Sequence, residues 1–225
     1  MKPKNKKALV FDSGAIITLA LNDLLYILEP LKKIFRGEFY ITETVKKEVV
    51  DKAFQIKRFM LESLMIKSLI NKKILVVVSN SALKEETKKI LDIANHLFKT
   101  ENEWIGLLHE GEASCIALFN LISTEKKALI IDERTTRMLC EAPENLHKLL
   151  ERKLHKKIKA RINNYPYFSN VKIIRSSELS FIAYKKNIIE LPASQKEALR
   201  ALLYATKYKG CAISYKEIEI AEKII

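Results

Sequence analysis

Short apolar runs alternate with longer amphipathic stretches along most of this 225-residue chain. Apolar runs at residues 7–11, 39–41, 74–78, 128–131 and 171–174 are typical of buried strands, and the segments between them carry apolar residues at helical spacing. Strands that are separated by helices usually lie parallel in one sheet, with the helices packed on its faces. The pattern therefore predicts an α/β sandwich with a largely parallel sheet.

The chain carries a large excess of positive charge. Lys and Arg number 40 against 27 for Asp and Glu, which gives a formal net charge of +13. Charge of this sign attracts polyanions, so nucleic acid or an acidic membrane surface is the natural partner. The three cysteines form no short pair that would indicate zinc or a disulfide framework, and no apolar stretch reaches the roughly 18 residues that span a bilayer. We therefore expect a cytoplasmic protein that does not span a membrane.

Acidic residues follow two of the predicted strands. Asp12 comes directly after residues 7–11, and Asp132 comes directly after residues 128–131. In an open parallel sheet, ligands bind beyond the carboxyl ends of the strands, so both side chains should reach the same edge. Glu112 begins a predicted helix upstream of the second strand, and Glu48 lies in the helix that follows the strand at 39–41. All four carboxylates can therefore converge on one crevice.

Each of these acids also has a purely structural interpretation. Asp12 and Asp132 can cap the helices that follow them. A carboxylate such as that of Glu112 is favoured at a helix N-terminus, and Glu48 can be an ordinary solvated residue of its helix. For each residue taken singly, both interpretations stay open.

Taken together, four segments resemble the acidic motifs of PIN domains in order and spacing. They are residues 10–16 (VFDSGAI), 44–49 (TVKKEV), 111–118 (GEASCIAL) and 129–134 (LIIDER). The first and third segments are the most specific, and the resemblance covers roughly residues 1–140.

This resemblance implies a compact three-layer α/β/α sandwich and a metal-dependent endoribonuclease that cleaves RNA phosphodiester bonds. It implies Asp12, Glu48, Glu112 and Asp132 as catalytic residues, with Asp12, Glu112 and Asp132 as ligands of Mg²⁺ or Mn²⁺. Crowded carboxylates repel one another until a divalent cation neutralises them, and oxygen ligands suit Mg²⁺ or Mn²⁺ better than zinc. A metal ion held in this way can activate water and stabilise charge on the phosphate.

Two details of the fourth motif stay open. Glu133 follows Asp132 directly, and we favour Asp132 as the fourth acid because it directly ends the predicted strand. Many family members place a hydroxyl residue two positions before this acid, where this chain has Ile130. The candidates to supply that hydroxyl are Ser13, Thr135 and Thr136.

A basic amphipathic stretch follows the fourth motif. Apolar residues recur every four positions from Leu150 to Ile162 and predict one basic helix at about 144–162. The cations on its other faces have two interpretations: they form an ordinary solvated surface, or they contact the phosphates of a nucleic acid. The predicted RNA-binding residues are Arg134, Arg152, Lys153, Lys156, Lys157 and Arg161.

We therefore expect a PIN-like domain at residues 1–176, which includes the basic helix, and a helical C-terminal extension at residues 177–225. The alternative function is a PIN-like RNA-binding scaffold with little or no catalytic activity, acting in RNA processing or ribosome assembly. A toxin role with an antitoxin-like protein partner and a homodimer both stay open. A phosphatase with Asp12 as nucleophile is remote, because a second aspartate commonly stands where this chain has Gly14.

Overall fold

Five strands form one parallel sheet in the order β3-β2-β1-β5-β7. The computed structural model describes residues 7–224, so the first six residues of the expected PIN-like domain and the last residue of the extension lie outside the described part. The largely parallel sheet predicted from the sequence is confirmed. The strands are β1 (Lys7–Phe11), β2 (Gly37–Thr42), β3 (Val76–Val78), β5 (Lys127–Ile130) and β7 (Ile173–Ile174).

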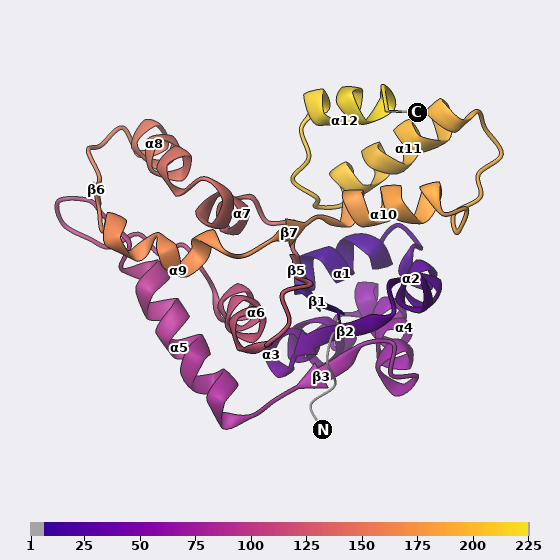
Figure 1. The fold of residues 1–225 in the computed structure, drawn as a ribbon, viewed down its shortest axis with the longest axis horizontal. Helices are drawn as coiled ribbons and strands as arrows, with labels where there is room; N and C mark the ends of the chain where they lie inside the picture. The colour runs from indigo at the N-terminus through magenta and orange to yellow at the C-terminus, as the bar shows by residue number, and fades with distance from the viewer. Residues whose placement is uncertain (1–6, 225) are drawn as a thin grey trace.

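Helices cover both faces of this sheet (Figure 1). On one side lie α1 (Ser13–Ala20), α2 (Leu28–Phe35) and α4 (Met60–Asn71). On the other side lies α6 (Glu110–Leu121), with α5 (Ser81–Asn95) packed outside it. Because helices cover both faces of this sheet, the side chains on both sides of its strands are largely buried. The strand sequences are therefore continuous apolar runs. The expected three-layer α/β/α sandwich is confirmed.

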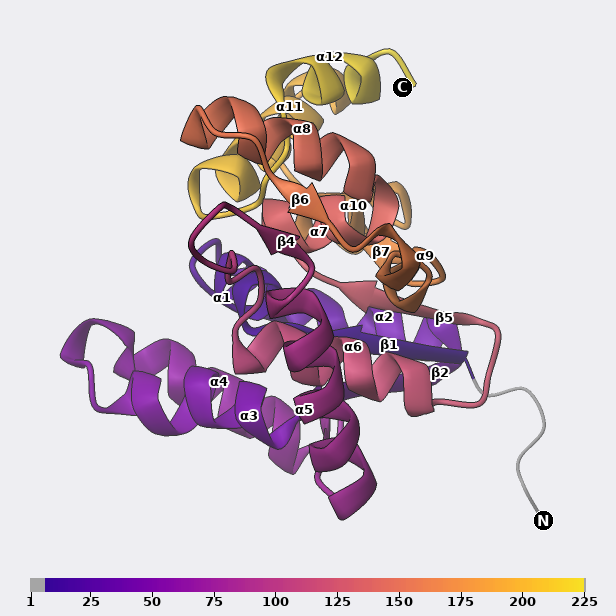
Figure 2. The same cartoon turned by 90° about the vertical axis from the view of Figure 1, so that its left-hand side faces the viewer.

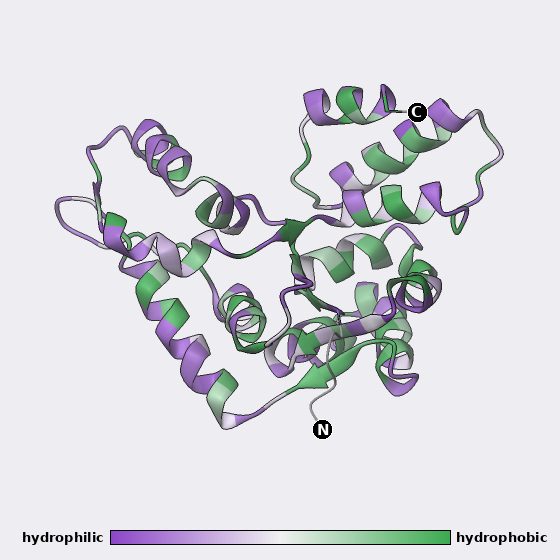
Figure 3. Ribbon diagram, viewed as in Figure 1, coloured by the Kyte–Doolittle hydropathy of each residue, from purple (hydrophilic) through white to green (hydrophobic). Residues whose placement is uncertain are grey.

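The core forms where these apolar runs meet. Phe11 of β1 and Phe39 of β2 are fully buried, with ring centroids 5.2 Å apart, and Ile130 of β5 is fully buried beside them in the sheet. Figure 3 shows the strands as hydrophobic, in contrast to outer helices such as α8 (Pro143–Leu154), which is largely hydrophilic. Apolar burial along the strands is therefore the main force that holds the sheet between its helices.

A close approach between β1 and β2 requires glycine at position 37. Gly37 pairs with Lys7 in the sheet, and a Cβ atom at residue 37 would overlap the Lys7 carbonyl oxygen and lie 2.5 Å from the Phe35 ring. We expect Gly37→Ala to lower the free energy of unfolding by about 2 kcal/mol or more, because the backbone of β1 would have to move. Urea denaturation measures this. The control is Gly106→Ala, whose added Cβ meets nothing within 4 Å, and equal effects of the two substitutions would contradict the prediction.

The helix after β2 changes from an α-helix to a π-helix partway along its length. Thr42 caps α3 (Glu43–Lys46), because its hydroxyl accepts a hydrogen bond from the Val45 N–H at 3.2 Å. The chain then continues as a π-helix over Lys47–Lys52. Apolar spacing did not predict this change, nor the 3₁₀ turn at Lys57–Phe59 that follows it. Single π-helical turns are rare and often stand at functional sites.

The predicted basic helix at about 144–162 is wrong in its second half. α8 ends at Leu154 because His155 adopts a left-handed backbone conformation, with φ 51°. The chain then forms β6 (Lys159–Ala160), which pairs antiparallel with β4 (Phe98–Lys99), and a 3₁₀ turn at Ile162–Asn164. The apolar residues that suggested one long helix therefore lie in α8, in the loop before β6 and in the 3₁₀ turn.

Three helices make up most of the C-terminal extension, as predicted. They are α10 (Ser176–Lys185), α11 (Gln195–Tyr208) and α12 (Tyr215–Glu222), and Figure 2 also places α11 and α12 at one end of the molecule. α10 packs on α1 and contributes Leu179 and Ala183 to the main core. α11 and α12 enclose a second, smaller core around Leu203 and Ile218. The remaining short elements are the 3₁₀ turn Leu25–Ile27, α7 (Arg134–Glu141) and α9 (Pro166–Ser169).

Within residues 7–224, no single helix is long and apolar enough to cross a bilayer. One bent pair, Ser13–Ala20 with Leu25–Phe35, meets the criteria of length and composition, with an angle of 113° between its two parts.

Candidate active site

Asp12 stands at the carboxyl end of the central strand β1 and begins α1. Its backbone N–H donates to the Ile130 carbonyl of β5 at 2.9 Å, and its Oδ2 accepts the N–H of Gly14 at 3.0 Å as the helix cap. The residue is only 3% exposed. The pKa of Asp12 is raised from 3.8 to about 7, chiefly by burial. Glu112 and Glu48 also contribute to this rise, and the backbone hydrogen bonds from Gly14 and Ser13 oppose it. Asp12 is therefore both a helix cap and a buried carboxylate near two others.

Glu48 and Glu112 reach the same region from different helices. Glu48 belongs to the π-helix, and its carboxylate lies against Gly111 of α6, where an added Cβ would be 3.1 Å from Glu48 Oε1. Glu112 follows in α6, and its Oε2 accepts the backbone N–H of His109 at 2.8 Å in a capping box. A side chain at position 111 would push against the Glu48 carboxylate, so glycine there leaves room for it.

Cys115, one turn further along α6, shows how close this helix lies to Asp12. Its Sγ lies 3.9 Å from Asp12 Oδ1 and 3.6 Å from the carbonyl oxygen of Phe11. Burial and the neighbouring Asp12 raise the pKa of the thiol well above its usual value. A thiol held neutral is a poor nucleophile, so the arrangement favours carboxylate chemistry over cysteine chemistry.

The fourth acid is held by the first residue of α10. Asp132 is 3% exposed, and its Oδ1 accepts the backbone N–H of Ser176 at 2.8 Å while its Oδ2 accepts the Ser176 hydroxyl at 2.6 Å. Ser176 is the first residue of α10 and is fully buried. In the register of β1 and β5, Phe11 pairs with Ile130, so Asp132 lies one residue beyond the level of Asp12. The two aspartates thus follow neighbouring strands at the same edge of the sheet.

Glu133 has a different role from Asp132. Its carboxylate accepts the backbone N–H groups of Thr135 at 2.8 Å and Thr136 at 2.6 Å, and so caps α7. The expectation that Ser13, Thr135 or Thr136 supplies a hydroxyl to the fourth acid is wrong, because the hydroxyl that binds Asp132 comes from Ser176. The two residues are 44 positions apart, and no local sequence pattern marks this contact.

A family model described as a PIN domain matches residues 8–144 of this chain. The chain belongs to the PIN-domain family. PIN domains are generally nucleases and typically use divalent metal ions, which supports a nuclease-type fold here. No curated protein matches the chain, and no solved structure matches it. The matched range contains all four predicted acids of the PIN motifs but ends before Ser176.

The four predicted acids of this PIN domain are not paired with cationic side chains in the part of the chain that the structure describes. Within residues 7–224, no Lys or Arg forms a salt bridge with Asp12, Glu48, Glu112 or Asp132. Crowded carboxylates without a counter-ion favour a bound cation, and oxygen donors match the preferences of Mg²⁺ or Mn²⁺. The donor set therefore fits such an ion by chemical type. In the arrangement of the described residues, however, no three His, Cys, Asp or Glu side chains stand together as a ready-made metal site.

The raised pKa of Asp12 makes the stability of the metal-free protein depend on pH. The folded state holds a proton on Asp12 up to about pH 7, whereas an unfolded aspartate with a pKa of 3.8 has already lost it. Because the folded state binds more protons in this interval, the free energy of unfolding falls as the pH rises through it. We expect wild type to lose on the order of 4 kcal/mol relative to Asp12→Asn between about pH 4 and pH 8, measured by urea denaturation in EDTA. Parallel profiles for the two proteins would contradict this.

The predicted RNA-binding cations lie in several separate places. Arg134 and Arg152 border one hollow beside α7 and α8, and Lys156 and Lys157 border another. The guanidinium carbon of Arg161 lies 4.4 Å from the centroid of the Trp104 ring. Lys153 is exposed on α8. The structure thus groups four of the six cations as two pairs, because α8 ends before Lys156.

Proposed function

We propose that this PIN-domain protein is a metal-dependent endoribonuclease that hydrolyses RNA phosphodiester bonds at the edge of the sheet where Asp12 stands. The observation that supports this most is the buried Asp12 carboxylate, whose pKa Glu112 and Glu48 help to raise. The chain has a net charge of +13, yet no cationic side chain pairs with these acids in residues 7–224. A divalent cation is the partner that such a cluster favours.

In this proposal, Asp12, Glu112 and Asp132 hold Mg²⁺ or Mn²⁺, and Glu48 completes the catalytic cluster. Such an ion, when bound, lowers the pKa of water and stabilises charge on the phosphate oxygens. The chain itself orients the carboxylates: Gly14 fixes Asp12, and Ser176 fixes both oxygens of Asp132. Restricting ligand motion in this way reduces the cost of assembling the site around an ion.

The predicted RNA-binding cations suit an RNA substrate. The residues expected to contact phosphates are Arg134, Arg152, Lys153, Lys156, Lys157 and Arg161. Their contribution would be sequence-independent attraction, which brings RNA to the protein and weakens as salt concentration rises.

The test of this proposal is RNA cleavage with and without a divalent ion. Wild type is expected to cleave single-stranded RNA in Mg²⁺ or Mn²⁺ and to stop in EDTA. Glu112→Gln is expected to lose at least about 10²-fold in rate, because it removes a charge while keeping an oxygen for the capping box. Glu219→Gln, an exposed position on α12, is the charge-matched control. Full activity of Glu112→Gln would overturn the assignment.

The second candidate is an RNA-binding scaffold, acting in RNA processing or ribosome assembly. It is favoured by the engagement of Glu112 with His109 and of Asp132 with Ser176, which leaves no preassembled set of three ligands among the described residues. RNA that stays intact after prolonged incubation with Mn²⁺, together with a steeply salt-dependent electrophoretic shift, would select this function. The antitoxin-like partner, the homodimer and the cytoplasmic location stay predictions.

A further inference from the structure

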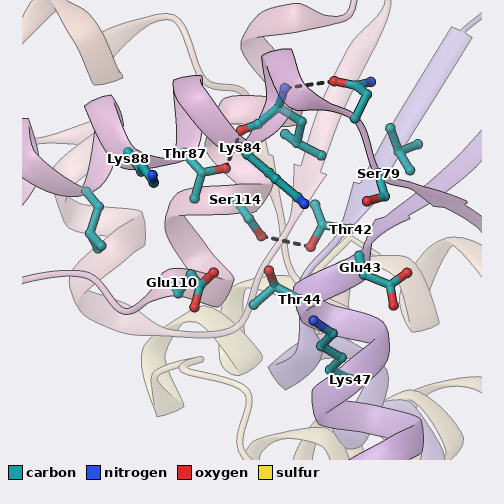
Figure 4. Close-up of a pocket in the computed structure, with 14 residues that line it drawn as sticks. Thr42, Glu43, Thr44, Lys47, Ser79, Lys84, Thr87, Lys88, Glu110 and Ser114 are labelled. Carbon is teal, nitrogen blue, oxygen red and sulfur yellow. Dashed lines mark hydrogen bonds between the residues drawn. The ribbon is translucent and has the colours of Figure 1, made fainter.

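A pocket of about 410 Å³ opens beside the acidic cluster (Figure 4). Thr42 at the end of β2 and Val78 at the end of β3 both line it, so it lies at the same carboxyl edge of the sheet as Asp12. This is the edge at which parallel sheets bind their ligands. Its volume lies within the range of pockets that hold small organic molecules.

The helices that line this pocket also carry or contact the acids. On α6, Glu110 and Ser114 line the pocket, while Gly111 between them lies against the Glu48 carboxylate. In the π-helix, Lys47 lines the pocket, and the next residue is Glu48. The pocket and the acidic cluster are therefore neighbouring compartments built from the same two helices.

Three lysines give the pocket a cationic rim. Lys84 and Lys88 stand one turn apart on α5, and Lys47 extends from the π-helix across the pocket (Figure 4). All three are exposed, and none forms a salt bridge with another residue of the range 7–224. Of the two acids in the lining, Glu43 is paired with Lys46 at 3.4 Å, a lysine that does not line the pocket.

The floor of the pocket combines apolar surface with hydroxyl groups that already have partners. Val78, Leu83 and Leu91 supply the apolar part. The hydroxyls of Thr42 and Ser114 lie 2.8 Å apart and hydrogen-bond to each other. A ligand that suits this lining has a flat apolar face for the floor and negative charge for the lysine rim.

We propose that this pocket is a nucleotide subsite, which binds one nucleotide of the substrate RNA next to the phosphodiester that is cleaved. The inference rests on the proposed function and deepens it. A nucleotide would place the flat face of its base against Val78, Leu83 and Leu91, and its phosphate near the lysines. Acidic residues repel an approaching RNA strand, so cations beside them hold the strand where the acids alone would not.

The test removes two lysines of the rim and measures RNA binding without metal. In the background Asp12→Asn, the double substitution Lys84→Gln and Lys88→Gln is expected to weaken binding of a short single-stranded RNA by about tenfold or more. The slope of log affinity against log salt should become shallower by about 1.4, because each lost phosphate contact removes about 0.7 for a single strand. The charge-matched control replaces Lys185 and Lys186, which are exposed at the end of α10, by glutamine. Equal effects of the two pairs would overturn the subsite.

Cleavage measured with Asp12 intact separates this proposal from the proposed function. The subsite predicts that Lys84→Gln with Lys88→Gln raises KM for RNA and leaves the Mn²⁺-induced rise in Tm unchanged. Wild-type KM in this variant would overturn the subsite and leave the nuclease assignment intact. Absence of cleavage in every protein, with the binding difference retained, would overturn the nuclease and leave the nucleotide pocket. Displacement of the RNA by poly-glutamate but not by a nucleoside monophosphate would assign the pocket to an acidic peptide and overturn the proposal.

Discussion

Asp12→Asn is expected to lower the rate of RNA cleavage by at least about 10³-fold while the protein stays folded. The substitution removes the charge of a candidate ligand that is only 3% exposed. Asparagine keeps a side-chain oxygen that can accept the Gly14 N–H, so α1 keeps its cap. It also removes a carboxylate whose ionised form is costly to bury, so the metal-free variant should be at least as stable as wild type at pH 8.

The matched control is Asp51→Asn, which makes the same change of charge in the π-helix that carries Glu48. The side chain of Asp51 is 52% exposed and pairs with Lys46, so it should not affect the acidic cluster. Thermal unfolding provides an independent measurement: Mn²⁺ should raise the Tm of wild type and of Asp51→Asn but not that of Asp12→Asn. Cleavage by Asp12→Asn at the wild-type rate would remove Asp12 from the mechanism.

Ser176→Ala is expected to lower Mn²⁺ affinity or turnover by about 10- to 100-fold, the effect typical of groups that orient metal ligands. The substitution removes the hydroxyl that donates to Asp132 Oδ2 at 2.6 Å and leaves the backbone N–H on Oδ1. Asp132 would then keep one of its two restraints and could rotate away from the edge of the sheet. The prediction makes the start of α10 part of the active site, although the PIN match ends at residue 144.

Ser177→Ala is the control that separates an effect on the orientation of Asp132 from a general loss of protein stability. Ser177 is also fully buried in α10, but its hydroxyl contacts the Cys211 thiol at 3.2 Å and not Asp132. Both alanine variants should lose about 1 kcal/mol of stability through a missing hydrogen bond. Only Ser176→Ala should change the concentration of Mn²⁺ that gives half-maximal cleavage, and equal shifts in both variants would show that Ser176 has no specific role.

The sheet and the place of the strand-end acids could be predicted because their causes are local. Continuous apolar runs such as residues 7–11 predict strands buried on both faces, and the strand ends then place Asp12 and Asp132 at one edge. The placement of Glu112 in the first turn of α6, which begins at Glu110, follows from the preference for carboxylates at a helix N-terminus. Each of these inferences needs only a few neighbouring residues.

Other features depend on contacts or conformations that short patterns do not encode. In the π-helix that carries Glu48, hydrogen bonds join residues five positions apart, one more than in an α-helix. The types of residue in and around this segment do not indicate the change. His155 ends α8 in a left-handed conformation that is usual for glycine, so the apolar spacing beyond it was misread. The bond between Ser176 and Asp132 joins segments 44 residues apart, and the parallel pairing of β5 with β7, in which Ile130 pairs with Ile174, brings them together.

Crystals of the protein soaked with Mn²⁺ test the central claim most directly, because the anomalous signal locates the ion independently of activity. The account predicts a peak at the carboxyl edge of the sheet, within about 2.0–2.6 Å of oxygens from Asp12 and at least one of Glu112 and Asp132. It also predicts that the peak disappears in Asp12→Asn. Saturating Mn²⁺ with no peak near Asp12, or a peak that persists unchanged in the variant, would contradict it.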